Sequence, residues 1–187
     1  MRKKFIEVYD DIVPKFVQDS IEKTLLVNSE IPLFYVDNVA TAVKERNFSP
    51  GFSNCFYLPE ENKVEGFSPL FLEVLYRLGN AINVSIDYIY QARVFVQVPP
   101  QIPSPDDIHV DLDEEHYVCL YYINDTDGDT IIFNDNREEI QRITPKKGRI
   151  VFFDGSLEHC SSKPSKTTRA VINVDFWGRK FGEEEKF

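Results

Sequence analysis

The sequence lacks any apolar run of about 18 residues, the length that a membrane-spanning helix needs. Its first residues, MRKKFIEVYDDIVPKF, are basic at the start but contain no apolar stretch of the kind found in secretory signals. Cysteine is scarce: Cys55, Cys119 and Cys160 form no CxxC pair. An odd, scattered set of cysteines is typical of reduced thiols, so we expect a cytoplasmic protein.

Basic residues are also in the minority. The chain has 21 lysine and arginine residues against 31 aspartate and glutamate residues, which gives a formal net charge of −10. Because a protein that binds a nucleic-acid backbone needs a basic surface, we do not expect nucleic acid as the main partner. The sequence contains no repeats and no low-complexity segment, and we interpret the acidic end GEEEKF as a solvated tail.

What is present suits one packed domain. A chain of 187 residues with 42% hydrophobic and 13% aromatic content can bury a substantial core. Apolar residues at helical spacing predict helices over 14–28 and 68–83. From residue 86 onward, short segments rich in β-branched and aromatic residues alternate with turn formers. The pattern predicts an α+β fold, mainly β, with a sandwich or barrel as its body. The expected strands lie at 86–99, 116–124, 129–135, 139–144, 148–154 and 169–178.

Two further segments, 44–67 and 99–108, carry proline and polar residues and are predicted to be long loops that frame an entrance.

The segment IHVDLDEEHYVCLYYIND, residues 108–125, contains the first candidate for chemistry. His109 and Asp111 stand two residues apart, and a strand would direct both side chains to the same face. An imidazole and a carboxylate buried together are costly unless something binds both. Two histidines and one carboxylate form the facial set of ligands that holds iron(II) and leaves coordination positions open.

The chain has only two other histidines that could complete such a set, His116 and His159. His116 lies five residues past Asp111 across an acidic loop, and we interpret it as a histidine of the loop or strand entry. His159 follows one strong strand and precedes another, so we take it as the third ligand. Arg169, ten residues later, opens the apolar strand RAVINVDF, where a buried guanidinium needs a carboxylate partner.

This pattern resembles that of the Fe(II)/2-oxoglutarate-dependent oxygenases, which have a double-stranded β-helix (jelly-roll, cupin-like) fold. It is most similar to the prolyl-4-hydroxylase-like branch and to small oxygenases of phage and bacterial genomes. CLYYIND followed by DGDTIIFND resembles a tyrosine-containing strand and the turn after it in that branch. KGRIVFFDGSLEHCSSKPSKTTRAVINVDF resembles its closing module, so the resemblance covers roughly residues 90–177.

The resemblance implies a single oxygenase domain over residues 1–187, made of three parts. Residues 1–85 are expected to give helical support, 86–178 the jelly-roll core, and 179–187 a short acidic tail. One departure is Val171, since many relatives carry a serine two residues after the arginine. The implied site consists of iron ligands and residues around 2-oxoglutarate: His109, Asp111 and His159 as ligands, Arg169 and Tyr122 on the distal carboxylate, Thr130 lining the pocket, and Asn173 near the open side of the metal.

The implied activity is that of a 2-oxoglutarate-dependent dioxygenase that hydroxylates a C–H bond and releases succinate and CO2. Its substrate is expected to be a peptidyl proline, another amino-acid side chain or a small molecule, with ascorbate as a candidate reductant. We expect a monomer or a homodimer in the cytoplasm, or in the host cytoplasm if a phage encodes the chain. Two alternatives remain: a non-catalytic jelly-roll module that binds metal or serves a structural role, and a cupin-type dioxygenase that uses no 2-oxoglutarate.

Overall fold

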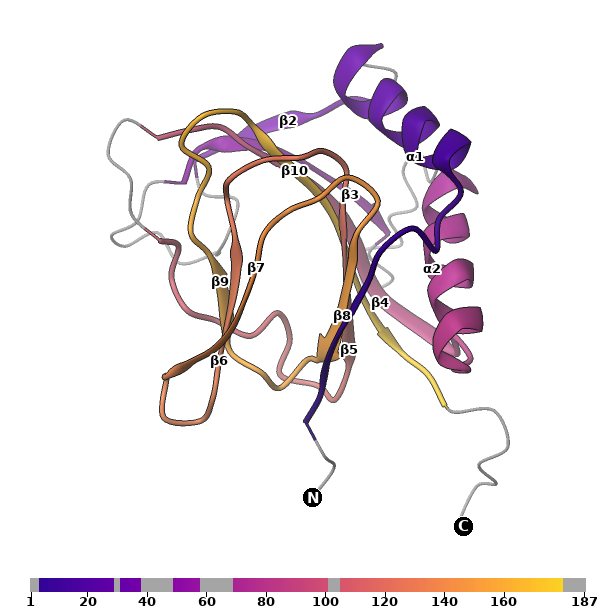
Figure 1. Cartoon of the computed structure of the whole chain (residues 1–187), viewed down its shortest axis with the longest axis vertical. Coiled ribbons are helices and arrows are strands. Elements are labelled where there is room, and N and C mark those ends of the chain that lie inside the picture. The colour runs from indigo at the N-terminus through magenta and orange to yellow at the C-terminus, as the bar shows by residue number, and fades with distance from the viewer. Residues whose placement is uncertain (1–3, 29–30, 38–48, 58–68, 101–104, 180–187) are drawn as a thin grey trace.

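The computed structural model describes residues 4–28, 31–37, 49–57, 69–100 and 105–179. Two antiparallel sheets face each other, and two helices cover the outer face of the larger sheet (Figure 1). A short π-helical turn, Lys23–Val27, continues the first helix. The elements in chain order are β1 (Ile6–Tyr9), α1 (Lys15–Glu22), β2 (Phe34–Val36), β3 (Gly51–Tyr57), α2 (Pro69–Ile82), β4 (Tyr88–Gln97), β5 (Tyr117–Tyr122), β6 (Thr130–Phe133), β7 (Glu139–Ile143), β8 (Ile150–Asp154), β9 (His159–Ser161) and β10 (Arg169–Trp177).

The strand order is that of a wound β-structure and not of a simple meander. The seven-stranded sheet has the order β1-β8-β5-β10-β4-β3-β2, and the three-stranded sheet has the order β7-β6-β9. The chain crosses repeatedly between the two sheets, so strands far apart in sequence become neighbours. The predicted fold class, α+β and mainly β, is confirmed.

Alternation along the central strands separates two cores. On β5, Cys119 and Tyr121 face the helices, whereas Leu120 and Tyr122 face the small sheet. β10 divides in the same way, since Ala170, Ile172, Val174 and Phe176 pack towards the helices. Because successive side chains of a strand point to opposite faces, Arg169, Val171, Asn173 and Asp175 lie on the face between the sheets.

Both predicted helices and all six predicted strands are confirmed, but the N-terminal half differs from expectation. β1, β2 and β3 lie in the part expected to be helical support. The prediction of a loop over 44–67 is wrong for Gly51–Tyr57, which forms a strand of seven residues, and the parts at 44–48 and 58–67 lie outside the described residues. Its sequence, GFSNCFY, is rich in turn formers, and antiparallel pairing with β4 overrides that local preference. Residue 68, the first of the second predicted helix, lies outside the described residues.

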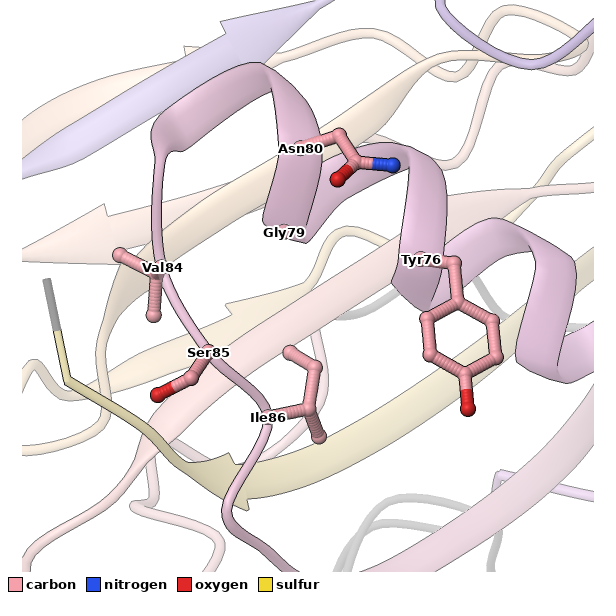
Figure 2. A pocket seen from close by; sticks show the side chains of 6 residues that line it. All are labelled: Tyr76, Gly79, Asn80, Val84, Ser85 and Ile86. Carbon is pink, nitrogen blue, oxygen red and sulfur yellow. The ribbon is translucent and has the colours of Figure 1, made fainter. Parts of the chain in front are cut away.

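The end of α2 borders a small surface hollow lined by Tyr76, Gly79, Asn80, Val84, Ser85 and Ile86 (Figure 2). A Cβ atom on Gly79 would lie 2.8 Å from the carbonyl oxygen of Val84, so glycine lets the returning chain pass close to the helix. None of the predicted site residues lines this hollow. Within the described residues, no helix combines the length and apolar character needed to cross a membrane.

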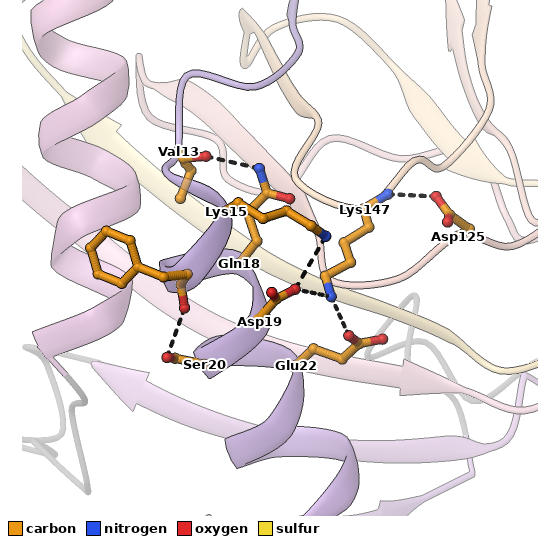
Figure 3. A network of polar contacts seen from close by, with 9 residues as sticks. Val13, Lys15, Gln18, Asp19, Ser20, Glu22, Asp125 and Lys147 are labelled. Atoms are coloured by element: carbon orange, nitrogen blue, oxygen red, sulfur yellow. Dashed lines mark hydrogen bonds and ion pairs between the residues drawn. The ribbon is translucent and has the colours of Figure 1, made fainter.

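Charged contacts fasten α1 to the turn before β8 (Figure 3). The Lys147 Nζ lies 2.7 Å from Asp19 Oδ1 and also contacts the Glu22 carboxylate. The backbone N–H of Lys147 donates to Asp125 Oδ1 at 2.8 Å. The same turn therefore connects α1 with the loop after β5 and fixes how the helix lies on the large sheet.

Asp10 gives a test of these N-terminal contacts. Arg149 donates to both of its carboxylate oxygens at 2.8 and 3.0 Å, and with help from Lys146 it lowers the pKa of Asp10 to about 2. Asp10→Asn is expected to lower the free energy of unfolding at pH 7 by less than about 1 kcal/mol, because the pair is partly screened by solvent. A lowered carboxyl pKa stabilises the fold above about pH 4, and the effect is lost as the pH falls through about 2.

Urea unfolding of both proteins between pH 7 and pH 2 measures this effect, and the two stabilities should converge at the acid end. Asp11→Asn is the matched control, because the Asp11 side chain is 75% exposed and has one contact at 3.9 Å with Lys146. If the difference in free energy of unfolding between wild type and Asp10→Asn stayed constant down to pH 2, the charge of Asp10 would not be the cause of that difference.

Candidate metal centre

Backbone pairing brings two of the predicted ligands together. His109 and His159 form an isolated antiparallel bridge, in which each backbone N–H donates to the carbonyl of the other at 3.0 and 2.8 Å. Residues paired in this way carry their side chains on the same face, and the two imidazole centroids lie 4.7 Å apart. One pair of hydrogen bonds therefore closes a loop of 49 intervening residues, 110–158.

The carboxylate of Asp111 lies between the two imidazoles. Its Oδ1 is 3.6 Å from His109 Nε2, and its Oδ2 is 3.4 Å from His159 Nε2. One donor atom from each of the three residues lies within 4.8 Å of the others. The side chains are 23%, 13% and 11% exposed in the order His109, Asp111 and His159, so the cluster is largely shielded from water.

Both histidines are held with the same ring nitrogen towards the cluster. His109 Nδ1 lies 2.9 Å from the carbonyl of Asp107, and His159 Nδ1 lies 3.2 Å from the carbonyl of Leu157. A carbonyl can only accept, so each Nδ1 carries a proton and each Nε2 is the ring nitrogen that can offer a lone pair to a metal ion. Metal-binding histidines are oriented in this way, and the donor set of two imidazoles and one carboxylate fits iron(II).

Electrostatics within the cluster favour an ionised Asp111. Burial acts to raise its pKa, but the imidazoles of His159 and His109 outweigh burial and hold the pKa of Asp111 well below its usual range. For His109, burial acts to lower the pKa, and the Asp111 carboxylate outweighs it and raises the pKa. The free site therefore already keeps the negative charge that a metal ligand needs.

The expectation that His109 and Asp111 belong to a regular strand is only partly met. β5 begins at Tyr117, after the acidic loop, and His109 makes a single bridge outside the named strands. The two side chains nevertheless share a face. His116, the rival ligand, is buried directly before β5, as expected for a strand-entry histidine.

Arg169 is 6% exposed and points between the sheets. Its Nε donates to the carbonyl of Gly128 at 2.8 Å, one terminal nitrogen donates to Gln97 Oε1 at 3.3 Å, and the other donates to Thr130 Oγ1 at 2.9 Å. A guanidinium has five N–H groups, so one on each terminal nitrogen remains. This pair has the fork geometry that binds a carboxylate.

Tyr122 and Thr130 lie beside this fork. The Tyr122 hydroxyl donates to Thr130 Oγ1 at 2.6 Å, and the guanidinium carbon of Arg169 lies 5.6 Å from the centre of the Tyr122 ring. Because Thr130 Oγ1 accepts from both Tyr122 and Arg169, its own hydroxyl hydrogen remains for another acceptor. Burial raises the pKa of Tyr122, so the phenol stays protonated.

Gly128 makes room for this arrangement. A Cβ atom there would lie 2.8 Å from Arg169 Cδ and 2.9 Å from the backbone nitrogen of Pro164. Glycine thus lets the loop before β6 pass directly over the arginine.

Asn173 joins the cluster from β10. Its amide nitrogen donates to Asp111 Oδ2 at 3.2 Å, and its Oδ1 is buried without a hydrogen-bond partner. Two residues further, Asp175 is fully buried, and its burial together with the charge of Asp111 raises the pKa of Asp175 well above its ordinary value. Asn173 therefore approaches the carboxylate ligand directly.

Sequence reasoning missed a buried polar network behind Arg169. Gln97 accepts from Arg169 and from Ser161, and it donates to Asp106 Oδ2 at 2.6 Å. The Lys163 ammonium pairs with Asp106 at 3.4 Å, with both side chains buried. The only signal for it was a lone glutamine in the apolar run VFVQV, opposite Arg169 in the register of β4 and β10.

Comparison with known proteins agrees with this geometry. Residues 104–177 match the family model of the 2OG-Fe(II) oxygenase superfamily. No curated protein matches the sequence.

Solved structures match most of the chain at low identity. A prolyl hydroxylase from Trichoplax adhaerens, solved with a peptide of a hypoxia inducible factor, is 12% identical with a TM-score of 0.65, over 92% of this chain and 83% of that one. A prolyl-4-hydroxylase from Pseudomonas putida is 13% identical with a TM-score of 0.64, over 93% of each chain. A viral collagen prolyl hydroxylase from Paramecium Bursaria Chlorella virus-1, solved with 2OG, is 16% identical with a TM-score of 0.61, over 92% and 96%.

The double-stranded β-helix expected from the sequence is confirmed by these neighbours. The resemblance to the superfamily is confirmed by the match over residues 104–177, which contains every one of the predicted site residues.

Proposed function

We propose that the chain is an Fe(II)- and 2-oxoglutarate-dependent dioxygenase that hydroxylates a C–H bond, because residues 104–177 match the family model of the 2OG-Fe(II) oxygenase superfamily. The observation that carries this proposal is the cluster of His109, Asp111 and His159 on the same protein as a buried guanidinium fork. A non-catalytic module is not favoured, because a buried charge such as Arg169 is expensive to keep without a ligand.

Iron fits the donor set of His109, Asp111 and His159. When bound there, it would supply the oxygen activation that couples decarboxylation of 2-oxoglutarate to hydroxylation, with release of succinate and CO2. The chain's own part is orientation. The carbonyls of Asp107 and Leu157 fix the two rings, and the Asn173 amide fixes the carboxylate.

The remaining donors of Arg169 and Thr130 suit the distal carboxylate of 2-oxoglutarate. Two parallel charge-assisted hydrogen bonds from one guanidinium give both strength and a defined orientation. Gln97 and the Gly128 carbonyl hold the guanidinium in that orientation before the cosubstrate arrives. Gln97 also supplies a polar contact at the arginine, where Val171 replaces the serine common in relatives.

For the substrate we propose a prolyl or other amino-acid side chain of a peptide, with a small molecule as the second candidate. The support is the similarity to three prolyl hydroxylases, one of them solved with a peptide. Ascorbate as reductant, a monomeric or homodimeric state and a cytoplasmic location stay predictions.

Anaerobic titration with Fe(II) and 2-oxoglutarate, followed by exposure to oxygen and measurement of succinate, tests the activity. We expect slow succinate formation without substrate and faster formation with proline-rich peptides. An absence of both succinate and calorimetric 2-oxoglutarate binding would favour the non-catalytic module. Turnover of a substrate without any need for 2-oxoglutarate would favour the cupin-type alternative.

Gln97 gives a sharper prediction within the same scheme. Gln97→Leu removes one partner of the Arg169 guanidinium, and a hydrogen bond to a charged group contributes about 1.5–3 kcal/mol. We expect the KM for 2-oxoglutarate to rise about tenfold or more, since 1.4 kcal/mol corresponds to one factor of ten, with kcat within about twofold.

Gln18→Leu is the matched control for Gln97→Leu. Gln18 is a buried glutamine of α1 that donates to the Val13 carbonyl at 2.8 Å, so its loss affects stability but not the KM. Equal KM values in wild type and Gln97→Leu would show that Gln97 does not position the arginine.

A further inference from the structure

His116 is held in the same way as the two predicted iron ligands. Its Nδ1 lies 2.7 Å from the carbonyl of Glu114, two residues earlier, as Nδ1 of His109 and of His159 lies near the carbonyl two residues before it. Nδ1 therefore carries a proton, and Nε2 is the ring nitrogen that can offer a lone pair to a metal ion. His116 is 2% exposed, and this Nε2 has no hydrogen-bond partner.

Gly155 packs on the ring of His116 without blocking that lone pair. A Cβ atom on Gly155 would lie 2.3, 2.4 and 2.5 Å from Nε2, Cδ2 and Cε1. Nearly equal distances to three neighbouring ring atoms place the glycine over the ring face and not in line with the Nε2 lone pair. The lone pair is thus buried, fixed in direction and unused.

Asp175, close to His116, has a carboxylate oxygen that could bind a metal ion. It is fully buried, Gln91 donates to its Oδ2, and its Oδ1 has no hydrogen-bond partner. Among the described residues no lysine, arginine or histidine forms an ion pair with Asp175, although the charge of Arg93 acts to lower its pKa. In its ionised form a carboxylate buried beside Asp111 is costly, which is why the pKa of Asp175 is raised, and a bound metal ion can offset that cost in place of the proton.

We propose that Asp111, His116 and Asp175 bind a second divalent metal ion, next to the predicted iron and sharing Asp111 with it. One donor atom from each of the three lies within 4.8 Å of the others, the same spacing that brings His109, Asp111 and His159 together. One imidazole and two carboxylates suit the class of Mn²⁺, Fe²⁺, Co²⁺ and Zn²⁺. A carboxylate has two oxygens, and in two-metal sites the ions lie about 3.5–4 Å apart.

The second ion would take the place of the proton on Asp175, so that Asp111 and Asp175 could both be ionised although they are buried together. The inference rests on the proposed function only through the shared residue Asp111, so the two can be tested separately.

The test is the number of Mn²⁺ ions that the full-length chain binds. Protein stripped with a chelator is dialysed against Mn²⁺, and bound manganese per chain is measured by elemental analysis together with the electron paramagnetic resonance spectrum. We expect two ions and the spectrum of a magnetically coupled pair in wild type. We expect one ion and an isolated Mn²⁺ spectrum in His116→Gln and in Asp175→Asn.

His159→Gln is the matched variant for the other site and should also retain one ion. Two variants at the second site guard against a folding defect in either one, and thermal unfolding of the stripped proteins shows whether each is folded.

The outcomes separate the two proposals. One result would be a single ion in wild type, which His159→Gln loses and His116→Gln keeps. That result would overturn the second metal site, and a buried water would be the simpler occupant. It would leave the oxygenase proposal intact. Two ions in both second-site variants would also overturn this assignment. No bound manganese in wild type would contradict both.

Discussion

Asp111→Asn is expected to reduce succinate formation by at least about a thousandfold, which at 1.36 kcal/mol per factor of ten corresponds to about 4 kcal/mol of barrier. Asparagine keeps the shape of the side chain and its place between the imidazoles of His109 and His159. It removes the negative charge that a divalent ion needs from its one anionic ligand at the predicted iron site. Iron binding should therefore fall together with turnover.

Iron binding by calorimetry and succinate by mass spectrometry measure the two effects independently. Asp113→Asn is the control, because Asp113 is exposed in the same acidic loop and belongs to neither donor set. A variant at position 111 with normal iron affinity and normal turnover would exclude Asp111 as a ligand. Retained iron binding with lost turnover would restrict its role to the reaction.

The site residues could be predicted from the sequence because their chemistry conflicts with their surroundings. A histidine and an aspartate at the head of an apolar run, and an arginine opening another, are costly in a core unless they bind something. The alternation that placed Tyr122 opposite Tyr121 is confirmed by the division of β5 between the two cores. Strand periodicity and buried charge thus gave both the fold class and the predicted centre.

The features of the fold and the site that the sequence does not predict depend on contacts between distant segments. Gly51–Tyr57 has the composition of a loop and becomes a strand only through its pairing with β4. Gln97 acquires a role only because the register of β4 and β10 sets it opposite Arg169. The position of His116 at the entry to a strand is confirmed, but the sequence does not show that His116, with its buried Nε2, lies near Asp175, with its buried Oδ1, because folding brings these distant segments together.

The second large effect is expected at Arg169. Arg169→Met removes the guanidinium fork that we assign to the distal carboxylate of 2-oxoglutarate. Removing one partner of a buried ion pair costs about 3–5 kcal/mol, so the KM for 2-oxoglutarate should rise at least about a hundredfold. Iron affinity should change little, because no donor atom of the metal cluster belongs to Arg169.

Arg169→Met also removes one donor each from the Gly128 carbonyl, Gln97 and Thr130, so a folding defect has to be separated from a binding defect. Arg169→Lys serves this purpose, since it keeps the buried charge but loses the planar fork. We expect an intermediate KM for it, with thermal stability closer to wild type.

Arg142→Met is the control, because Arg142 is an exposed arginine paired with Glu139. If both Arg169 variants had the wild-type KM for 2-oxoglutarate, the distal carboxylate of the cosubstrate would have to bind elsewhere. If substrate turnover persisted with no 2-oxoglutarate at all, the cupin-type chemistry would replace the present proposal.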